Sequence, residues 1–287
     1  MAQVQNISRG TGGETTLNQN TLSELTAEDA CPLRSQREAG SVTSIRIAGL
    51  DGHNPRQNKL LAALPLADFR SIAEQLEFIA MPCHMVVCEA DAGMKHVYFP
   101  TSCIVSLMFE ARDGASVETA MIGFDGIVGV GMFMGGGASR QRAVVKCAGY
   151  GFRLPVNHLT AEFARGGAFQ KALLGYAQAL MTQMAQISVC NRHHNVTQQL
   201  CRLLLQTLDR LPSSEICLTQ EAIAAMLGVR RESIACAAGI LQVAGVIHYA
   251  RGHIKVLNRP ALESRSCECY GCATKEYGQS HAEQAAR

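Results

Sequence analysis

The stretch of sequence that decides the fold is residues 218–257, LTQEAIAAMLGVRRESIACAAGILQVAGVIHYARGHIKVL. Its first part predicts a short helix capped by Thr219 and ended by a tight turn at Gly228, since a hydroxyl caps a first turn and glycine tolerates the left-handed conformation. A second helix is predicted at about 231–244, followed by two strands of a β-hairpin. This order predicts a winged helix-turn-helix spanning roughly residues 195–258.

The second predicted helix is polar at its start and apolar along one flank. A DNA recognition helix needs this arrangement, because its N-terminal residues meet base edges while its flank docks on the domain. Arg231 can pair bidentately with guanine, and Glu232 can accept from a cytosine amino group. The basic tip of the hairpin can contact phosphate. The candidate DNA-binding residues are Thr219, Gln220, Arg230, Arg231, Glu232, Ser233, Arg251 and His253.

The bulk properties of the chain restrict the alternatives. A length of 287 residues with 47% apolar residues predicts two folded domains, and a net charge of +2 is too small to indicate a polyanion partner by itself. There is neither a membrane-length apolar run nor an export signal, so a cytoplasmic location and no membrane association are expected. Most of the twelve cysteines are then expected to be reduced and buried.

The middle of the chain has the pattern of a small β-domain. Short β-branched and aromatic runs recur between residues 78 and 154, each bounded by Gly, Pro or Asp, which predicts a small barrel or roll. Two short helices are predicted before it, from Asn58. Residues 1–57 are rich in polar residues and glycine without a sustained period, and we expect them to be mostly disordered.

A long helix is predicted over about 168–191, which contains no proline and one glycine. Its apolar residues recur at intervals of three and four, approximating a heptad seam, so we expect this stripe to pair with a second copy of the chain. The alternative is that the stripe packs on the roll of its own chain. The candidate dimerisation residues are Phe169, Leu173, Tyr176, Leu180, Met184 and Ile187.

The succession of roll, long helix and the quoted motif resembles the Crp-Fnr superfamily of bacterial regulators over roughly residues 58–262. The resemblance implies an α+β fold with a jelly-roll-like, cyclic-nucleotide-binding-like β-roll and flanking helices, a long dimerisation helix and a C-terminal winged helix-turn-helix. The expected domains are a mostly disordered tail (1–57), the roll (58–160), the dimerisation helix (161–193), the DNA-binding domain (194–262) and a flexible cysteine-containing tail (263–287).

The resemblance also implies residue roles in the DNA-binding domain. Gln220 matches a position that usually contacts phosphate, and residues 231–233 match readers of bases or backbone. The sequence departs from the family pattern at two places. Cys236 stands where a third polar base reader is common, which implies a different site preference, and Arg230 stands where a Ser or Thr helix cap is usual.

The roll lacks the residues with which cyclic-nucleotide members of the family hold their ligand. The expected Glu is replaced by Val130, and the expected Arg-Ser pair by Gln141 and Arg142. We therefore expect no cyclic nucleotide and assign no ligand or cofactor. Arg140 and Arg142 are weak candidates for holding some other anion, against the alternative of ordinary solvated arginines.

The cysteines and histidines offer further hypotheses about metals. An iron-sulfur sensor of this family carries its ligands in an N-terminal segment where this chain has only Cys31, and haem would have to use the isolated His84 or His96. Cys267, Cys269 and Cys272 are spaced closely enough to bind zinc, with His281 or another chain as fourth ligand, or to form a redox switch. The alternative is an exposed, reduced tail, and no metal is assigned.

Together these features predict a DNA-binding transcription regulator that binds a pseudo-palindromic operator as a homodimer, without cyclic AMP. The expected partners are double-stranded DNA, a second copy of the chain and, as a candidate only, RNA polymerase. The chain is not expected to be an enzyme, because the glycine-rich residues 123–129 are not followed by the long helix of a phosphate-binding loop. The alternative is a signalling or interaction module with a degenerate roll and no specific DNA binding.

Overall fold

The computed structural model describes residues 53–271, and the tail expected to be disordered lies outside this range up to residue 52. The described chain begins with three short helical segments, η1 (Pro55–Gln57), α1 (Lys59–Ala62) and α2 (Leu66–Ala73). Asn58 links them to the roll, because its buried amide donates to the carbonyls of Pro100 (2.9 Å) and Gly126 (2.8 Å) while its side-chain oxygen caps α1. Asn58, where the sequence pattern changes, ties these segments to the roll, but η1 already lies within the tail 1–57 that was expected to be disordered, so that expectation is wrong for residues 55–57.

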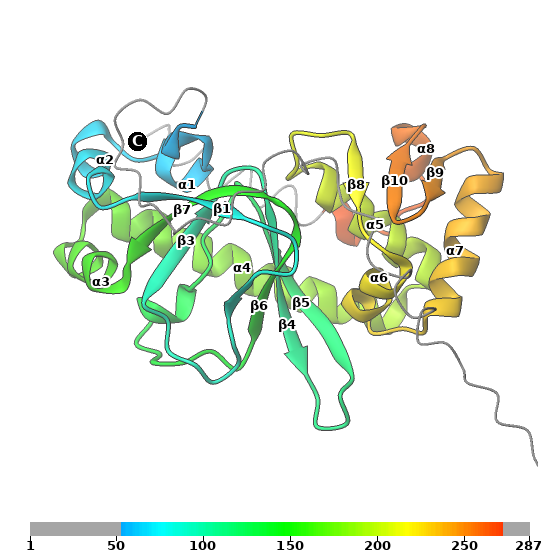
Figure 1. The fold of residues 1–287 in the computed structure, drawn as a ribbon, viewed down its shortest axis with the longest axis horizontal. Coiled ribbons are helices and arrows are strands. Elements are labelled where there is room, and N and C mark those ends of the chain that lie inside the picture. Colours follow the sequence, from blue (N-terminus) through cyan, green and yellow to red (C-terminus); the bar gives the residue numbers. More distant parts are fainter. Residues whose placement is uncertain (1–52, 272–287) are drawn as a thin grey trace, which may run out of the picture. The chain divides into compact units, whose positions relative to one another are not determined.

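The β-roll predicted for the middle of the chain is confirmed (Figure 1). Its strands form two antiparallel sheets, in the orders β1-β7-β3 and β2-β6-β4-β5. The bounds are β1 Glu77–Met81, β2 Val86–Cys88, β3 His96–Pro100, β4 Ile104–Glu110, β5 Ser116–Ile122, β6 Arg142–Cys147 and β7 Gly149–Pro155, with the short helix η2 at Val130–Met132.

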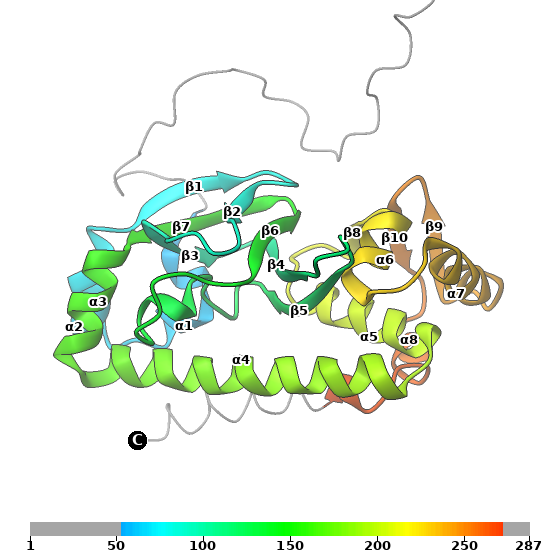
Figure 2. The ribbon, with the colours of Figure 1, turned by 90° about the horizontal axis from the view of Figure 1, so that it is seen from below.

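Two helices follow the roll where the sequence predicted one element at 161–193. They are α3 (Val156–Arg165) and α4 (Gly167–His193). The helical conformation is interrupted at Gly166, whose φ of 80° is accessible to glycine at little cost. Figure 2 shows α4 running along the strands of the roll and continuing toward α5 and α8. The long helix is therefore present, but it begins after this break.

The apolar stripe assigned to dimerisation packs inside its own chain, so that assignment is wrong. Phe169, Leu173, Tyr176 and Leu180 are buried in the core of the roll, Met184 packs against that core, and Ile187 is also buried. The five buried side chains have almost no surface left to offer a partner, and the partly buried Met184 packs against the same core. The other face of α4 carries exposed apolar residues instead, including Leu174 (48% exposed) and Met181 (51% exposed).

The C-terminal part has the predicted winged helix-turn-helix, and a strand and a helix that the sequence analysis did not identify. Strands β8, β10 and β9 form an antiparallel sheet in that order. A core of leucines and isoleucines from α5, α6 and α7 lies against it. The bounds are α5 Val196–Leu208, β8 Glu215–Cys217, α6 Gln220–Leu227, α7 Arg231–Val243, β9 Ile247–Ala250, β10 His253–Val256 and α8 Arg259–Glu263.

The second core is shared between the C-terminal part and the roll. Ile104, Met108 and Met121 of the β4-β5 pair are buried in the same cluster as the leucines of α5. Arg210, just after α5, forms a buried ion pair with Asp125 of the roll (2.9 Å). Of the helices within residues 53–271, none combines the length and apolar character needed to cross a bilayer.

Candidate nucleic-acid interface

The turn between α6 and α7 is built from local signals that the sequence displays. Thr219 caps α6 by accepting a hydrogen bond from the backbone N–H of Ala222 (3.1 Å), as predicted. Gly228 ends α6 in the left-handed conformation (φ 65°), and its N–H donates to the carbonyl of Ala224. The two caps fix where α6 stops and therefore where α7 can start.

The first turn of α7 presents polar side chains to solvent, and its later turns anchor the helix. Arg231 and Glu232 are exposed, whereas Ile234 and Leu241 are fully buried in the second core. Arg230 occupies the N-cap position of α7 and forms no side-chain cap hydrogen bond, because a guanidinium has no acceptor for the backbone N–H groups of the first turn. This arrangement matches the expected recognition helix, with polar residues at the tip and an apolar flank.

The structure brings four of the predicted DNA-binding residues together around one hollow of about 440 Å³. The hollow lies where the starts of α6 and α7 meet the hairpin, and its lining includes Thr219, Gln220, Arg231 and Arg251. We call it the α6–α7 notch. Glu232 and Ser233 instead line a neighbouring groove of about 820 Å³ between α7 and the start of α5, together with Cys236. Neither hollow is lined by Arg230 or His253.

Tyr249 is a notch residue that the sequence analysis missed. Its hydroxyl donates to the carbonyl of Leu218 (2.8 Å), and burial raises its pKa to about 12, so the hydroxyl stays protonated and the hydrogen bond persists. This bond holds the hairpin against the start of α6. The alternation of β9 indicated that Tyr249 faces one side of the hairpin, but the sequence did not show what it faces.

The hairpin tip is a tight turn with a basic residue at its apex. Arg251 and Gly252 join β9 to β10 with positive φ values of 48° and 81°, the pair required by a type I′ turn. The turn holds the Arg251 side chain in solvent beside the notch. His253 begins the central strand β10 and is half-buried, opposite Ala250 and Cys217.

The roll contains a partly open cavity of about 300 Å³ whose lining contains no charged side chain. Val130 lines it, as do Leu107, Ile122 and Leu180. Arg142 points elsewhere and pairs with Glu89 (2.9 Å) and Glu110 (3.6 Å), and Arg140 is not part of the lining. The two arginines considered for an anion site are therefore not brought together in this cavity.

The cysteines after α8 are not in an exposed tail. Cys267 and Cys269 are buried, so the expectation of exposed thiols is wrong for these two, while Cys272 lies outside the described residues. The expectation failed because the chain packs back against α4, which no local pattern indicates. His84 is exposed, and His96 lies in β3, where burial is the main cause of a lowered pKa. Neither histidine joins a group of potential metal ligands among residues 53–271.

Comparison with known families identifies the C-terminal part. Residues 198–265 match the family model of the Crp-like helix-turn-helix domain. This range includes α6, α7 and the hairpin, and so covers every predicted DNA-binding residue. A search of curated protein sequences gave no significant match.

Several solved structures share the fold of the described chain. FixK2 from Bradyrhizobium japonicum is 15% identical with a TM-score of 0.59, over 67% of this chain and 98% of that one. TTHB099, a transcriptional regulator of the CRP family from Thermus thermophilus, is 16% identical with a TM-score of 0.56, over 66% and 96%. The c-di-GMP responsive regulator CLP from Xanthomonas campestris is 15% identical with a TM-score of 0.55, over 67% and 99%. At these identities the similarity establishes the fold.

Proposed function

We propose that this protein, a DNA-binding transcription regulator with a Crp-like helix-turn-helix domain and the fold of Crp/Fnr regulators, binds a pseudo-palindromic operator as a homodimer without needing cyclic AMP. The observation that carries the proposal is the α6–α7 notch, where Gln220, Arg231 and Arg251 converge from three elements. A single surface thus combines a base-reading helix start with phosphate-contacting groups at its margins.

In this proposal α7 enters the major groove. Arg231 and Glu232 project from its first turn toward base edges, and Ser233 and Arg230 contact bases or backbone beside them. Gln220 and Thr219 at the start of α6, with Arg251 and His253 of the hairpin, contact the phosphates that flank the groove. Cys236, one turn further along α7, is exposed on the same helix and offers an apolar contact at the position where the family resemblance implies a polar base reader.

We assign dimerisation to the exposed face of α4. Leu174, Gln178, Met181, Ala185 and Ser188 are exposed and recur at intervals of four and three, which forms a heptad stripe. When a second copy of the chain covers the exposed leucine and methionine of this stripe, the burial of their apolar surface stabilises the dimer. Two α4 helices paired in this way would present two copies of α7 to successive major grooves, about 34 Å apart.

Independence from cyclic AMP is supported by the chemistry of the roll cavity. A cyclic nucleotide carries a phosphate charge, which needs a cation or several hydrogen-bond donors when it is taken out of water. The cavity is lined mainly by apolar side chains, with Ser139 and Gln141 among the few polar ones, and Gln141 already donates to Thr119 (2.8 Å).

The remaining parts of the proposal follow from DNA binding. The chain acts in the cytoplasm, where bacterial DNA is found, and carries no catalytic activity of its own. RNA polymerase is the candidate further partner, because a regulator bound at a promoter acts through the polymerase.

The test is selection of bound sequences from a random duplex pool by the full-length protein, with and without cyclic AMP. A two-fold symmetric motif recovered equally under both conditions is expected. A motif that appears only with cyclic AMP would refute the ligand part of the proposal. Failure to enrich any motif would favour the alternative of an interaction module without specific DNA binding.

A further inference from the structure

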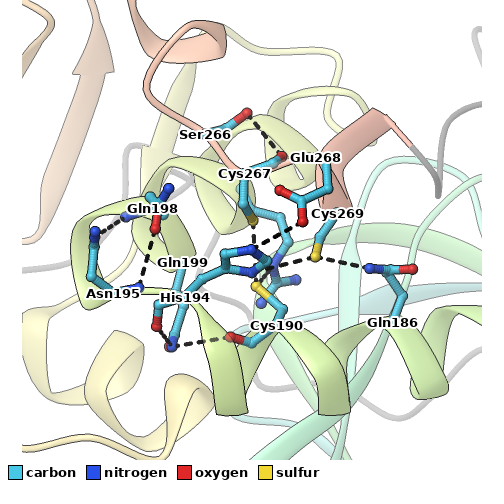
Figure 3. Close-up of polar contacts among 11 residues, drawn as sticks. Gln186, Cys190, His194, Asn195, Gln198, Gln199, Ser266, Cys267, Glu268 and Cys269 are labelled. Carbon is cyan, nitrogen blue, oxygen red and sulfur yellow. Dashed lines mark hydrogen bonds and ion pairs between the residues drawn. The ribbon is translucent and has the colours of Figure 1, made fainter.

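Four potential metal ligands converge where α4 ends (Figure 3). Cys190 lies in the last turn of α4 and His194 follows as its C-cap residue, so a spacing of four residues places both on one side of the helix end. Cys267 and Cys269 come from the segment after α8. The four ligand atoms all lie within 4.8 Å of one another, and the three cysteines are buried.

The segment that carries Cys267 and Cys269 is held in place by contacts beyond the cluster itself. The hydroxyl of Tyr270 donates to Asp209 (2.8 Å), and Arg259 of α8 contacts both Tyr270 (2.8 Å) and Asp209 (2.6 Å). These bonds fix the chain on both sides of the two cysteines. The positions of Cys267 and Cys269 next to α4 therefore do not depend on contacts among the four ligands alone.

The spacing of the ligand atoms suits one tetrahedral ion. With zinc bonds of about 2.3 Å to sulfur and about 2.0 to 2.1 Å to nitrogen, tetrahedral geometry separates two sulfurs by roughly 3.8 Å and a sulfur from a nitrogen by roughly 3.5 Å. The Sγ atoms of Cys190 and Cys267 are 3.5 Å apart, and Cys269 Sγ is 3.5 Å from His194 Nδ1. Ligand atoms this close leave room for a single ion between them.

We propose that Cys190, His194, Cys267 and Cys269 bind one zinc ion in a structural Cys3His site. Each cysteine supplies a thiolate and loses its proton on binding, and His194 supplies Nδ1 as a neutral imidazole. All four positions are filled by protein ligands, as in structural sites, so the ion has no open position for substrate.

The groups around the four ligands are those that support a bound metal. The other ring nitrogen of His194, Nε2, lies 3.2 Å from a carboxylate oxygen of Glu268, the pairing that orients metal-binding histidines. The side-chain amide of Gln186 donates to Cys269 Sγ (2.8 Å), and Arg202 Nε donates to Cys190 Sγ (3.2 Å). Donors directed at sulfur stabilise the thiolate form.

A buried arginine offsets the negative charge that the site would carry. One zinc ion with three thiolates carries a net charge of −1, which is costly to bury alone. Arg202 is itself buried (2% exposed) and, within residues 53–271, forms no salt bridge with a carboxylate. Its guanidinium against Cys190 would offset this charge, and the further negative charge of Glu268 beside His194 is exposed to solvent, which screens it. Zinc binding thus accounts for an arginine that is otherwise buried without an anionic partner in contact.

The position of the site gives it a structural consequence. Cys190 and His194 end the long helix, and Asn195 begins the capping box of α5, the first helix of the DNA-binding domain. Cys267 and Cys269 follow the last helix of that domain. A zinc ion here ties the end of the domain to its beginning at the junction with α4, and so restrains how α7 is held relative to α4.

The first experiment measures metal in the full-length protein, purified without chelator, by plasma mass spectrometry. About one zinc per chain is expected. Cys190→Ser and Cys269→Ser are expected to lose it, while the matched control Cys83→Ser, an exposed cysteine of the roll, keeps it. Cys272→Ser and His281→Ala should also keep it, and loss of zinc in either would refute the ligand set.

A second variant guards against failure of a cysteine variant to fold. Glu268 is exposed, so Glu268→Ala should fold normally, yet it removes the carboxylate that orients His194. We expect zinc affinity, measured by competition with a chromophoric chelator, to fall roughly 10- to 100-fold. Cobalt added to the stripped wild-type protein should give the intense visible bands of a tetrahedral thiolate site, and these should be absent from Cys190→Ser.

Several results would overturn the proposal. One is that the purified protein contains no metal and gives no cobalt spectrum. Another is that it contains iron in place of zinc. A third is that peptide mapping without reductant finds a disulfide between Cys190 and Cys267. Affinity for zinc that is unchanged in Glu268→Ala would also count against the role of His194. Because none of these measurements uses DNA, failure of the zinc site and failure of the proposed function are distinguishable.

Discussion

Glu118 provides a direct test of the burial of a carboxyl group in the roll. It lies in β5, is only 4% exposed, and accepts a hydrogen bond from the hydroxyl of Ser106. Burial raises its pKa to about 7 from an ordinary value of 4.5, although Arg202 and Lys146 act in the opposite direction. The folded protein thus favours a neutral carboxyl at this position, and we expect Glu118→Gln to mimic that form.

The magnitude follows from the two pKa values. Between pH 4.5 and 7 the folded state holds a proton that the unfolded state has released, so stability falls as pH rises through this window and then levels off. At about 1.4 kcal/mol per pKa unit, the raised pKa of Glu118 lowers the free energy of unfolding by under about 1 kcal/mol at pH 5 and by roughly 3 kcal/mol at pH 8. Glu118→Gln carries no such cost.

The assay is urea unfolding followed by circular dichroism at pH 5 and pH 8, at one protein concentration. We expect the free energies of unfolding of wild type and Glu118→Gln to be similar at pH 5, and the variant to be more stable by roughly 3 kcal/mol at pH 8. The control is Glu74→Gln, at an exposed position between α2 and β1, whose stability should equal that of the wild type at both pH values. A Glu118→Gln variant that is less stable than wild type at pH 8 would refute the argument.

Four other changes test the interface, the helix face and the shared core. Arg231→Ala should lower specific DNA binding by about 1 to 3 kcal/mol, measured as the ratio of affinities for selected and random duplexes, and an unchanged ratio would exclude base reading. Arg251→Ala should weaken binding to all sequences and reduce the salt slope by about one; a loss limited to one operator would contradict phosphate contact. Leu174→Asp, at an exposed position that does not line the roll cavity, should shift sedimentation toward monomer without unfolding the roll, so an unaltered dimer would argue against the α4 stripe. Arg210→Ala should cost about 3 to 5 kcal/mol of unfolding free energy by stranding buried Asp125, and an effect below about 1 kcal/mol would show that the pair is solvated.

The sequence was sufficient for the elements whose signals are local. Thr219, Gly228 and the turn at Arg251 and Gly252 each act through their own backbone neighbourhood, so capping and turn rules located α6, α7 and the hairpin correctly. Strands β2 to β6 of the roll were predicted from short β-branched and aromatic runs bounded by Gly, Pro or Asp, whereas β1 and β7 were not identified. The contact of Tyr249 with Leu218 was missed because it joins residues 31 apart, and nothing near either residue indicates the other.

The long helix shows a limit of periodicity. Its sequence contains two apolar stripes, one with Leu173 and Leu180 and one with Leu174 and Met181, and both have heptad-like spacing. Period alone cannot say which stripe meets the roll of the same chain. The larger stripe, with Phe169, Leu173 and Leu180, was assigned to the dimer interface. The structure buries it in the core of the roll, as expected for the most apolar face of a helix.

The metal ligands show the same limit in chemistry. Sequence reasoning grouped cysteines that are close together in the chain, Cys267, Cys269 and Cys272, and expected the fourth ligand from His281 or from another chain. The structure instead joins two of these with Cys190 and His194, more than seventy residues earlier. The earlier pair has its own local signal, because a cysteine and a histidine four residues apart at a helix end lie on one face. A Cys-x-Cys pair and a Cys-x3-His pair are each half of a tetrahedral site, and neither half is informative until the fold places the end of the DNA-binding domain against the end of α4.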